Sequence, residues 1–180
     1  MQGDFDAHRK RLEELGAEVV LVRDPEQLEK IDALVIPGGE STTFLKFLEP
    51  HGFFDRLKDF VRKKPTFGTC AGAILLAKEV VGRPQASLGA LDVRIRRNAY
   101  GRQIESSIRE GSFNGTALKM VFIRAPKIEA VGASVQVLAR ESDDPVLVQQ
   151  GNVLAATFHP ELTADTRVHE QFVNIAENQA

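Results

Sequence analysis

The chain has 180 residues, of which 43% are hydrophobic and 27% charged, and its formal net charge is −2. This length fits a sizeable core, so we expect one domain over residues 1–180. The charge balance favours neither nucleic acid nor an anionic membrane as a partner, and no apolar run approaches the roughly 20 residues of a membrane span. The single cysteine excludes internal disulfides and zinc sites built from several cysteines.

Helix-like and strand-like segments alternate in the first half of the chain. Apolar periodicity and capping signals predict helices over residues 4–15, 25–30, 53–63 and 71–80. Strands are predicted over residues 17–22, 32–36 and 66–67. The strand over 32–36 is continuously apolar, which is typical of a parallel sheet covered on both faces, and residues 37–42 follow it as a loop leading into a helix.

The second half of the chain is richer in strands. They are predicted over residues 88–96, 119–124, 135–140, 146–149 and 153–158, and a helix over 166–176 follows. Gly151-Asn152 supports a hairpin turn between the last two strands. The whole pattern predicts an α/β fold: a doubly wound, mostly parallel sheet flanked by helices, with an added antiparallel section. Such a sheet usually opens on a strand, whereas this chain opens on a helix, so we expect the first strand to be missing.

Cys70 lies in a G-x-C-x-G pattern over residues 68–72, between a predicted strand and a predicted helix. This pattern is typical of a nucleophile elbow, in which small neighbours let a reactive side chain project from a tight turn. The amide groups at the start of the following helix favour a thiolate. The alternative is a small buried cysteine that only fills the strand–helix junction.

His159 and Glu161 stand at the end of a late predicted strand. The glutamate is two residues from the histidine, close enough to orient the imidazole through one ring nitrogen. Together with Cys70 they form a Cys–His–carboxylate set, which is suited to thiolate attack on an acyl carbon. The alternatives are a His-Pro step that simply ends a strand and a solvated glutamate.

The glycine pair Gly38-Gly39 follows the predicted strand over 32–36. Because no Cβ intervenes, its backbone N–H groups can approach a substrate closely. Together with the N–H of Ala71 they would form an oxyanion hole, a feature worth roughly 10²–10³ in rate per donor. A plain turn or a weak phosphate cradle is the alternative, although the chain carries neither a P-loop nor a dinucleotide-binding fingerprint.

Three further histidines, His8, His51 and His169, fall on predicted helices or helix edges. Neither cysteine nor carboxylate partners accompany them at metal-ligand spacing. We therefore expect these histidines at the surface and expect no metal site.

Five motifs in chain order carry a family resemblance. They are PGGESTT (37–43), FGTCAG (67–72), RNAYGRQ (97–103), VFIRAP (121–126) and FHPELT (158–163), and they cover the chain nearly end to end. At these residues the chain resembles the class I glutamine amidotransferases, and within them the glutaminase subunits of pyridoxal 5′-phosphate synthases. Members of that family normally begin with a strand that precedes the segment matching residues 1–5 here, and it would lie inside the sheet.

The resemblance implies a role for each matching residue. Cys70 would be the nucleophile, His159 the general base and acid, and Glu161 the orienting carboxylate. The implied glutamine-binding positions are Gly39, Glu40, Ser41, Arg97, Ile123 and Arg124, with oxyanion N–H groups from Gly39 and Ala71. Glutamine is a zwitterion, so arginines in the pocket suit its α-carboxylate.

The implied activity is hydrolysis of L-glutamine to L-glutamate and ammonia, without a metal or organic cofactor. The chain is too short to carry an ammonia-consuming domain as well, so the resemblance implies a partner: the synthase subunit, a (β/α)₈ barrel, in a hetero-oligomeric complex. Pyridoxal 5′-phosphate (vitamin B6) would then be the product of the complex. A reduced, cytoplasmic location fits a reactive thiol.

Two other hypotheses stay open at this point. One is a different thiol hydrolase of related fold, such as a γ-glutamyl peptide hydrolase, because the same three catalytic residues would serve it. The other is a non-catalytic binding subunit, disabled by the short N-terminus.

Overall fold

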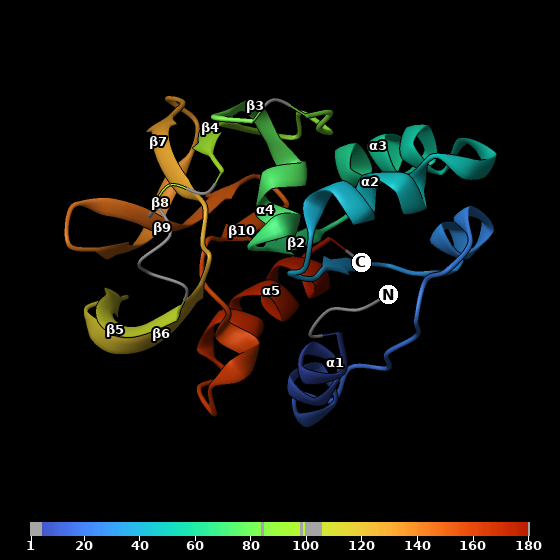
Figure 1. Cartoon of the computed structure of the whole chain (residues 1–180). Coiled ribbons are helices and arrows are strands. Elements are labelled where there is room, and N and C mark those ends of the chain that lie inside the picture. Colours follow the sequence, from blue (N-terminus) through green and yellow to red (C-terminus); the bar gives the residue numbers. More distant parts are fainter. Residues whose placement is uncertain (1–4, 84, 98, 100–105, 180) are drawn as a thin grey trace.

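The computed structural model describes residues 5–83, 85–97, 99 and 106–179. Within these residues a seven-stranded sheet has the order β1-β2-β10-β9-β8-β5-β6, and a three-stranded sheet has the order β3-β4-β7. Figure 1 shows α2, α3 and α4 on one side of strands β2 and β10, and α1 and α5 on the other. In the described part of the chain, no helix is long and apolar enough to cross a membrane.

The elements have the following bounds. The large sheet contains β1 (Leu34–Ile36), β2 (Thr66–Thr69), β5 (Ser106–Phe113), β6 (Thr116–Ile123), β8 (Gln136–Glu141), β9 (Asp144–Gln150) and β10 (Val153–Ala156). The small sheet contains β3 (Ala77–Val81), β4 (Leu91–Arg96) and β7 (Lys127–Val131). The α-helices are α1 (Phe5–Glu14), α2 (Ser41–Leu48), α3 (Phe53–Lys63), α4 (Ala71–Leu76) and α5 (Arg167–Glu177). Three short 3-10 helices are η1 (Pro25–Lys30), η2 (Pro50–Gly52) and η3 (Pro160–Leu162).

The predicted α/β class, with helices around a parallel section and an added antiparallel section, is confirmed. Strand β2 pairs in parallel with β1 and with β10. From β10 onward the neighbours in the large sheet pair antiparallel. The antiparallel part is therefore larger than expected, because hairpins follow one another in the second half. The predicted turn at Gly151 is one of them, and it joins β9 to β10 with Gly151 at φ 55°.

Strands β2 and β10 are buried on both faces, whereas in β1, where the sequence predicts such covering, Leu34 and Val35 are only partly buried. On β10, Val153 and Ala155 pack into a core with residues of α2, α3 and α4. Leu154 and Ala156 alternate with them and pack into a second core with residues of α1 and α5. Side chains of a strand point alternately to opposite faces, so one strand supplies both cores. This double covering fixes the carboxyl ends of β2 and β10, where the site lies.

The predicted strand over 17–22 is wrong: these residues are not paired in either sheet. Residues 17–23 and β1 instead both line a groove of about 810 Å³, which α1 and α5 also line. A strand needs a hydrogen-bonded neighbour to satisfy its backbone. In the described chain, β1 pairs only with β2 and forms the edge of the large sheet beside this groove.

The other differences concern the limits of elements. The helix predicted over 71–80 ends at Leu76, because residues from Ala77 onward form β3 and pair with β4. A short apolar run does not distinguish a buried helix from a strand. The sequence patterns also do not predict strands β3, β5 and β7. The sequence of β5, SSIREGSF, is mostly polar and gives no strong alternation of apolar residues.

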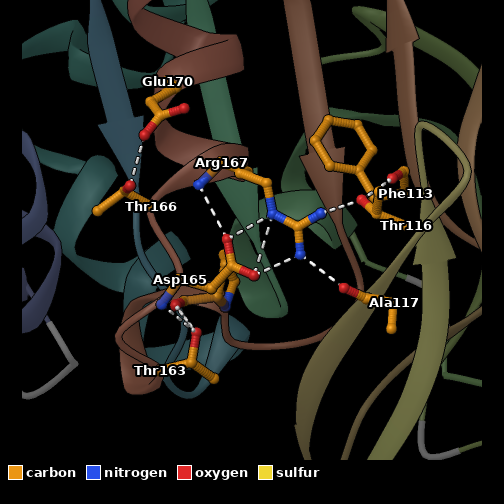
Figure 2. Close-up of polar contacts among 9 residues, drawn as sticks. Phe113, Thr116, Ala117, Thr163, Asp165, Thr166, Arg167 and Glu170 are labelled. Carbon is orange, nitrogen blue, oxygen red and sulfur yellow. Dashed lines mark hydrogen bonds and ion pairs between the residues drawn. The ribbon is translucent and has the colours of Figure 1, made fainter.

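Arg167, at the start of α5, joins that helix to the β5–β6 hairpin (Figure 2). Its guanidinium donates hydrogen bonds to the Asp165 carboxylate at 2.6 Å and to the Ala117 carbonyl oxygen at 2.6 Å, and also to the Thr116 hydroxyl. The hydrogen bond from Arg167 lowers the pKa of Asp165. These contacts hold the segment between η3 and α5, and η3 contains Glu161.

Candidate active site

Cys70 occupies the tight turn between β2 and α4, with φ 48° and ψ −102°. Positive φ is rare for a residue with a side chain, so this backbone persists only where its surroundings impose it. Two backbone hydrogen bonds do so: Cys70 N–H donates to the Ala156 carbonyl at 2.9 Å, and Ile74 N–H donates to the Cys70 carbonyl at 3.2 Å. The turn therefore has the geometry of a nucleophile elbow.

The glycines on either side of Cys70 permit close contact between α4 and the sheet. A Cβ on Gly72 would lie 2.1 Å from the Ile36 carbonyl oxygen, and a Cβ on Gly68 would lie 2.6 Å from the Gly72 carbonyl carbon. Both distances are far below van der Waals contact. The G-x-C-x-G pattern thus lets α4 begin directly against β1 and β2.

His159 and Glu161 lie beside the elbow and are nearly buried, with 4% and 2% exposure. His159 N–H donates to the Val121 carbonyl at 2.8 Å, which fixes the backbone next to β6. Its ring Nδ1–H donates to Glu161 Oε1 at 2.7 Å, because a carboxylate only accepts. The imidazole also hydrogen-bonds the Cys70 side chain.

The charges around His159 favour its protonated form. Burial lowers the pKa of His159, but hydrogen bonds and charges from Cys70 and Glu161 outweigh it and raise that pKa to about 10. An imidazolium beside a cysteine is the partner that stabilises a thiolate. The arrangement therefore places a protonated imidazole against the thiol of Cys70.

Gly38 lies directly against this pair. A Cβ at position 38 would be 2.5 Å from His159 Cε1 and 3.5 Å from Cys70 Cβ. The next residue, Gly39, has φ 140°, a backbone conformation that residues with side chains rarely adopt. The glycine pair therefore has a packing role beside the imidazole that the sequence does not reveal.

Glu40 and Ser41 begin α2 next to the glycine pair. Ser41 is buried, and its hydroxyl donates to Gln85 Oε1 at 2.8 Å. The exposed Glu40 carboxylate accepts hydrogen bonds from the Thr42 and Thr43 hydroxyls at 2.5 Å and 3.0 Å. These hydrogen bonds lower the pKa of Glu40.

The remaining expected glutamine-binding residues lie at different depths. Ile123 ends β6, and its carbonyl oxygen is 3.9 Å from Cys70 Sγ. Arg97 has a buried Nη1 that meets no hydrogen-bond partner among the described residues, and burial followed by the charge of Arg83 lowers its pKa. Arg124 is exposed, with φ 43°. Residues 98 and 100–103 of the RNAYGRQ motif lie outside the described residues, as do residues 1–4.

The expectation that His8 and His169 lie at the surface is wrong. They are 3% and 0% exposed; His8 stands beside Glu161 and Thr69, and His169 stands beside His8. A signal exists in the sequence: His8 is one helical turn before the buried Leu12, and His169 is three residues before the buried Phe172. Residues at these spacings share a helix face, so both histidines belong to the core-facing sides of α1 and α5.

Comparison with known proteins places this geometry in a family. The model of the SNO glutamine amidotransferase family matches residues 1–178. The chain belongs to this family. The resemblance drawn from the five motifs is thereby confirmed.

Several known proteins are similar to this chain over nearly their whole length. Pyridoxal 5′-phosphate synthase subunit PdxT of Koribacter versatilis is 63% identical, over 99% of this chain and 93% of its own. The protein of the same name from Thermosipho africanus is 51% identical, over 97% of this chain and 95% of its own. A crystal structure of a glutamine amidotransferase superposes with a TM-score of 0.91 at 49% identity, covering 98% of this chain and 95% of that one.

Proposed function

We propose that this chain is the glutaminase subunit of a pyridoxal 5′-phosphate synthase: it hydrolyses L-glutamine to L-glutamate and ammonia and passes the ammonia to a synthase subunit. Membership of the SNO glutamine amidotransferase family and the PdxT relatives support this function. The observation that carries it is the buried contact of Cys70, His159 and Glu161 at a strained elbow.

In the first half of the reaction the Cys70 thiolate attacks the carbon of the glutamine side-chain amide. The imidazolium of His159 gives its proton to the departing nitrogen, so ammonia leaves and a γ-glutamyl thioester remains. Neutral His159 then takes a proton from water, which attacks the thioester and releases glutamate and the thiolate. Glu161 accepts the Nδ1–H throughout, so the other ring nitrogen faces the reacting atoms.

The oxyanion that forms during both attacks would accept hydrogen bonds from the N–H groups of Gly39 and Ala71. Ala71 is the first residue of α4, and the first N–H groups of a helix have no partner within it. Gly39 adjoins Gly38, which touches the His159 ring. These placements support backbone donors on the thiol side of the site.

Glutamine would bind through charges that complement its zwitterionic end. The buried Nη1 of Arg97, which meets no hydrogen-bond partner in the described parts of the chain, suits the α-carboxylate, and Glu40, whose charge acts on Arg97, suits the α-ammonium group. Ser41, Ile123 and Arg124 are the further proposed binding positions. Ile123 is supported by its carbonyl next to Cys70 Sγ.

A partner is needed because free ammonia is protonated and lost to water near neutral pH. The synthase subunit consumes it, so pyridoxal 5′-phosphate is the product of the complex. The cytoplasm is the proposed location, since a catalytic thiol works in a reducing compartment.

The test is ammonia release from glutamine, measured for the chain alone and with the synthase subunit, in wild-type protein and in Cys70→Ala. We expect release by the wild-type complex and none by Cys70→Ala, whose circular dichroism should match wild type. Substantial turnover by Cys70→Ala would refute the assignment of Cys70 as the nucleophile. Cleavage of γ-glutamyl peptides in place of glutamine would favour a peptide hydrolase. A folded wild-type chain that is inactive even with the partner would favour a non-catalytic subunit.

A further inference from the structure

Two buried histidines extend the contacts of the proposed catalytic residues into the core. His8 Nε2 lies 3.4 Å from Glu161 Oε2 and 3.0 Å from the hydroxyl of Thr69, the residue before the nucleophile. His8 Nδ1 lies 3.0 Å from His169 Nε2. A continuous row of polar contacts therefore runs from α5 through α1 to the carboxylate that orients His159 (Figure 1 shows the two helices side by side).

The rings are fixed in place by packing. Both meet Phe67 of β2 edge-on, at centroid distances of 6.0 Å for His8 and 5.8 Å for His169. Helix α1 also contacts η3, the turn that holds Glu161. His8 cannot leave the carboxylate, nor His169 leave His8, without disturbing the core, so the contacts are a stable part of the fold.

The free oxygen of Glu161 defines which nitrogen of His8 carries hydrogen. Oε1 accepts from His159, whereas Oε2 is buried and makes no standard hydrogen bond among the described residues. His8 Nε2 lies 3.4 Å from this oxygen and makes its shorter contact, 3.0 Å, with the Thr69 hydroxyl. A lone pair on Nε2 would face the carboxylate and repel it, so Nε2 carries the hydrogen, which lies between Thr69 Oγ1 and Glu161 Oε2, and Nδ1 accepts.

The same reasoning orients His169. Because His8 Nδ1 accepts, His169 Nε2 must donate to it. His169 Nδ1 is then an unprotonated nitrogen, which agrees with its having no hydrogen-bond partner in the described part of the chain. The opposite arrangement would bury an N–H without an acceptor, the costlier of the two. One tautomer of each ring therefore leaves no buried N–H of the row without an acceptor.

Both rings are neutral at physiological pH. Burial, followed by the charges of His169 and His159, lowers the pKa of His8 well below its ordinary value. Burial, followed by Arg11, lowers the pKa of His169 to about 4, against a smaller opposing effect of Glu14. His8 thus faces the Glu161 carboxylate as a neutral imidazole with its N–H directed toward the oxygen. It holds the oxygen without placing a second cation beside protonated His159.

We propose that His8 is a positioning residue for glutamine hydrolysis: its Nε2–H, which also contacts the Thr69 hydroxyl, faces the second oxygen of Glu161 and limits how that carboxylate can turn, and His169 fixes the tautomer of His8 that makes this possible. The carboxylate then has one orientation, with Oε1 directed at His159. Loss of the donor leaves Glu161 free to turn, and the thiolate–imidazolium pair loses part of its support. This inference rests on the proposed glutaminase function.

Three substitutions of His8 separate the donor from the bulk of the ring. The amide nitrogen of His8→Gln reaches the place of Nε2, whereas that of His8→Asn reaches only the place of Nδ1, and His8→Leu has no donor. In the complex with the synthase subunit, we expect kcat to fall about 10- to 100-fold for His8→Leu and His8→Asn with little change in KM. His8→Gln should keep most of the activity, and His169→Leu should lose less than His8→Leu.

The pH dependence of kcat/KM tests the positioning role directly, because a His8 that only stabilised the fold would not change it. The groups around the His159 ring are Cys70, Glu161 and His8, and a poorly held Glu161 supports the imidazolium less. The alkaline limb of kcat/KM should therefore move to lower pH by about half a unit or more in His8→Leu and His8→Asn. His51→Asn, which replaces an exposed histidine at φ 59°, is the matched control and should keep the wild-type limb.

Alkylation of Cys70 by iodoacetamide across the same pH range separates this proposal from the proposed function, because it needs neither glutamine nor partner. If the wild-type complex hydrolyses no glutamine, the proposed glutaminase function is refuted. The pH dependence of Cys70 alkylation in the His8 variants still tests the positioning role of His8. Two results would overturn the positioning role. One is that His8→Gln and His8→Asn show the same pH dependence of alkylation. The other is that folded His8→Leu keeps the wild-type kcat and the wild-type alkaline limb of kcat/KM. If His8→Leu does not fold, the comparison of His8→Gln with His8→Asn decides.

Discussion

Gly38→Ala tests whether the position of the His159 ring controls catalysis. The added methyl carbon would lie 2.5 Å from His159 Cε1, 3.2 Å from its Nδ1 and 3.5 Å from Cys70 Cβ. An ordinary carbon–carbon contact is about 3.5 Å, so either the ring or the Gly38 backbone must move by about 1 Å. The ring carries the hydrogen bonds to Cys70 and Glu161, so its displacement disturbs both.

A displacement of this size predicts a loss of about 10²-fold in kcat, equivalent to about 2.7 kcal/mol of transition-state stabilisation. The assay is ammonia release by the complex with the synthase subunit, together with a thermal melt of the chain alone. Gly115→Ala is the control: Gly115 has φ +76° and no atom within 4 Å of an added Cβ, so it should lose some stability and no activity. If kcat of Gly38→Ala stays within about twofold of wild type while Gly115→Ala behaves as expected, the contact does not position the imidazole.

Three further predictions concern the turn at Cys70 and the imidazole of His159 beside it. His159→Asn should abolish turnover and slow the alkylation of Cys70 near neutral pH, since the thiolate loses its cationic partner; an unchanged alkylation rate would contradict the contact. The folded pKa of His159, about 10, exceeds its ordinary 6.5, so its contribution to stability is full below pH 6.5 and is lost as the pH rises through 10. The free energy of unfolding should therefore decline over that window, and a decline of equal size in His159→Asn would contradict this origin. Gly72→Ala should lower the free energy of unfolding by about 3 kcal/mol, because its Cβ would lie 2.1 Å from the Ile36 carbonyl oxygen; a melt like that of wild type would show that α4 can move off β1 at little cost.

The parts of the fold that the sequence predicts best are those with strong local signals. Helix α3 has the predicted bounds, residues 53–63, because its apolar residues recur at helical spacing and become buried. The segment over 17–22 carries an equally clear apolar pattern, yet it forms no strand. Strand formation depends on a neighbour in space, and a pattern of side chains cannot supply the missing hydrogen-bond partner. The same limit applies to β3, whose sequence AKEVV follows the apolar helix α4 without an intervening glycine or proline.

The candidate site divides in a similar way. The G-x-C-x-G and His-x-Glu spacings are local, and they are enough to predict Cys70 and Glu161 as the neighbours of His159. The packing of Gly38 on the imidazole joins two loops far apart in sequence, so only the folded chain shows it. The surface position expected for His8 is wrong for another reason. Histidine is common at surfaces, and one polar residue on an apolar helix face is weak evidence until its buried partners are known.

The contacts around Cys70 indicate how the strained turn persists. Its N–H is held by Ala156 of β10, and the glycine at 72 lets Ile36 of β1 touch α4. The imidazole beside it is held by β6 through its backbone and by Glu161 through its ring. The restraints come from strands β1, β6 and β10 and from the 3-10 helix η3, so relaxing the turn would require several elements to move together, and the cost of the strain is spread over the fold. His8 differs from these, because it acts on Glu161 from α1. Loosening α1 should therefore reduce the support of the imidazolium while leaving the elbow itself in place.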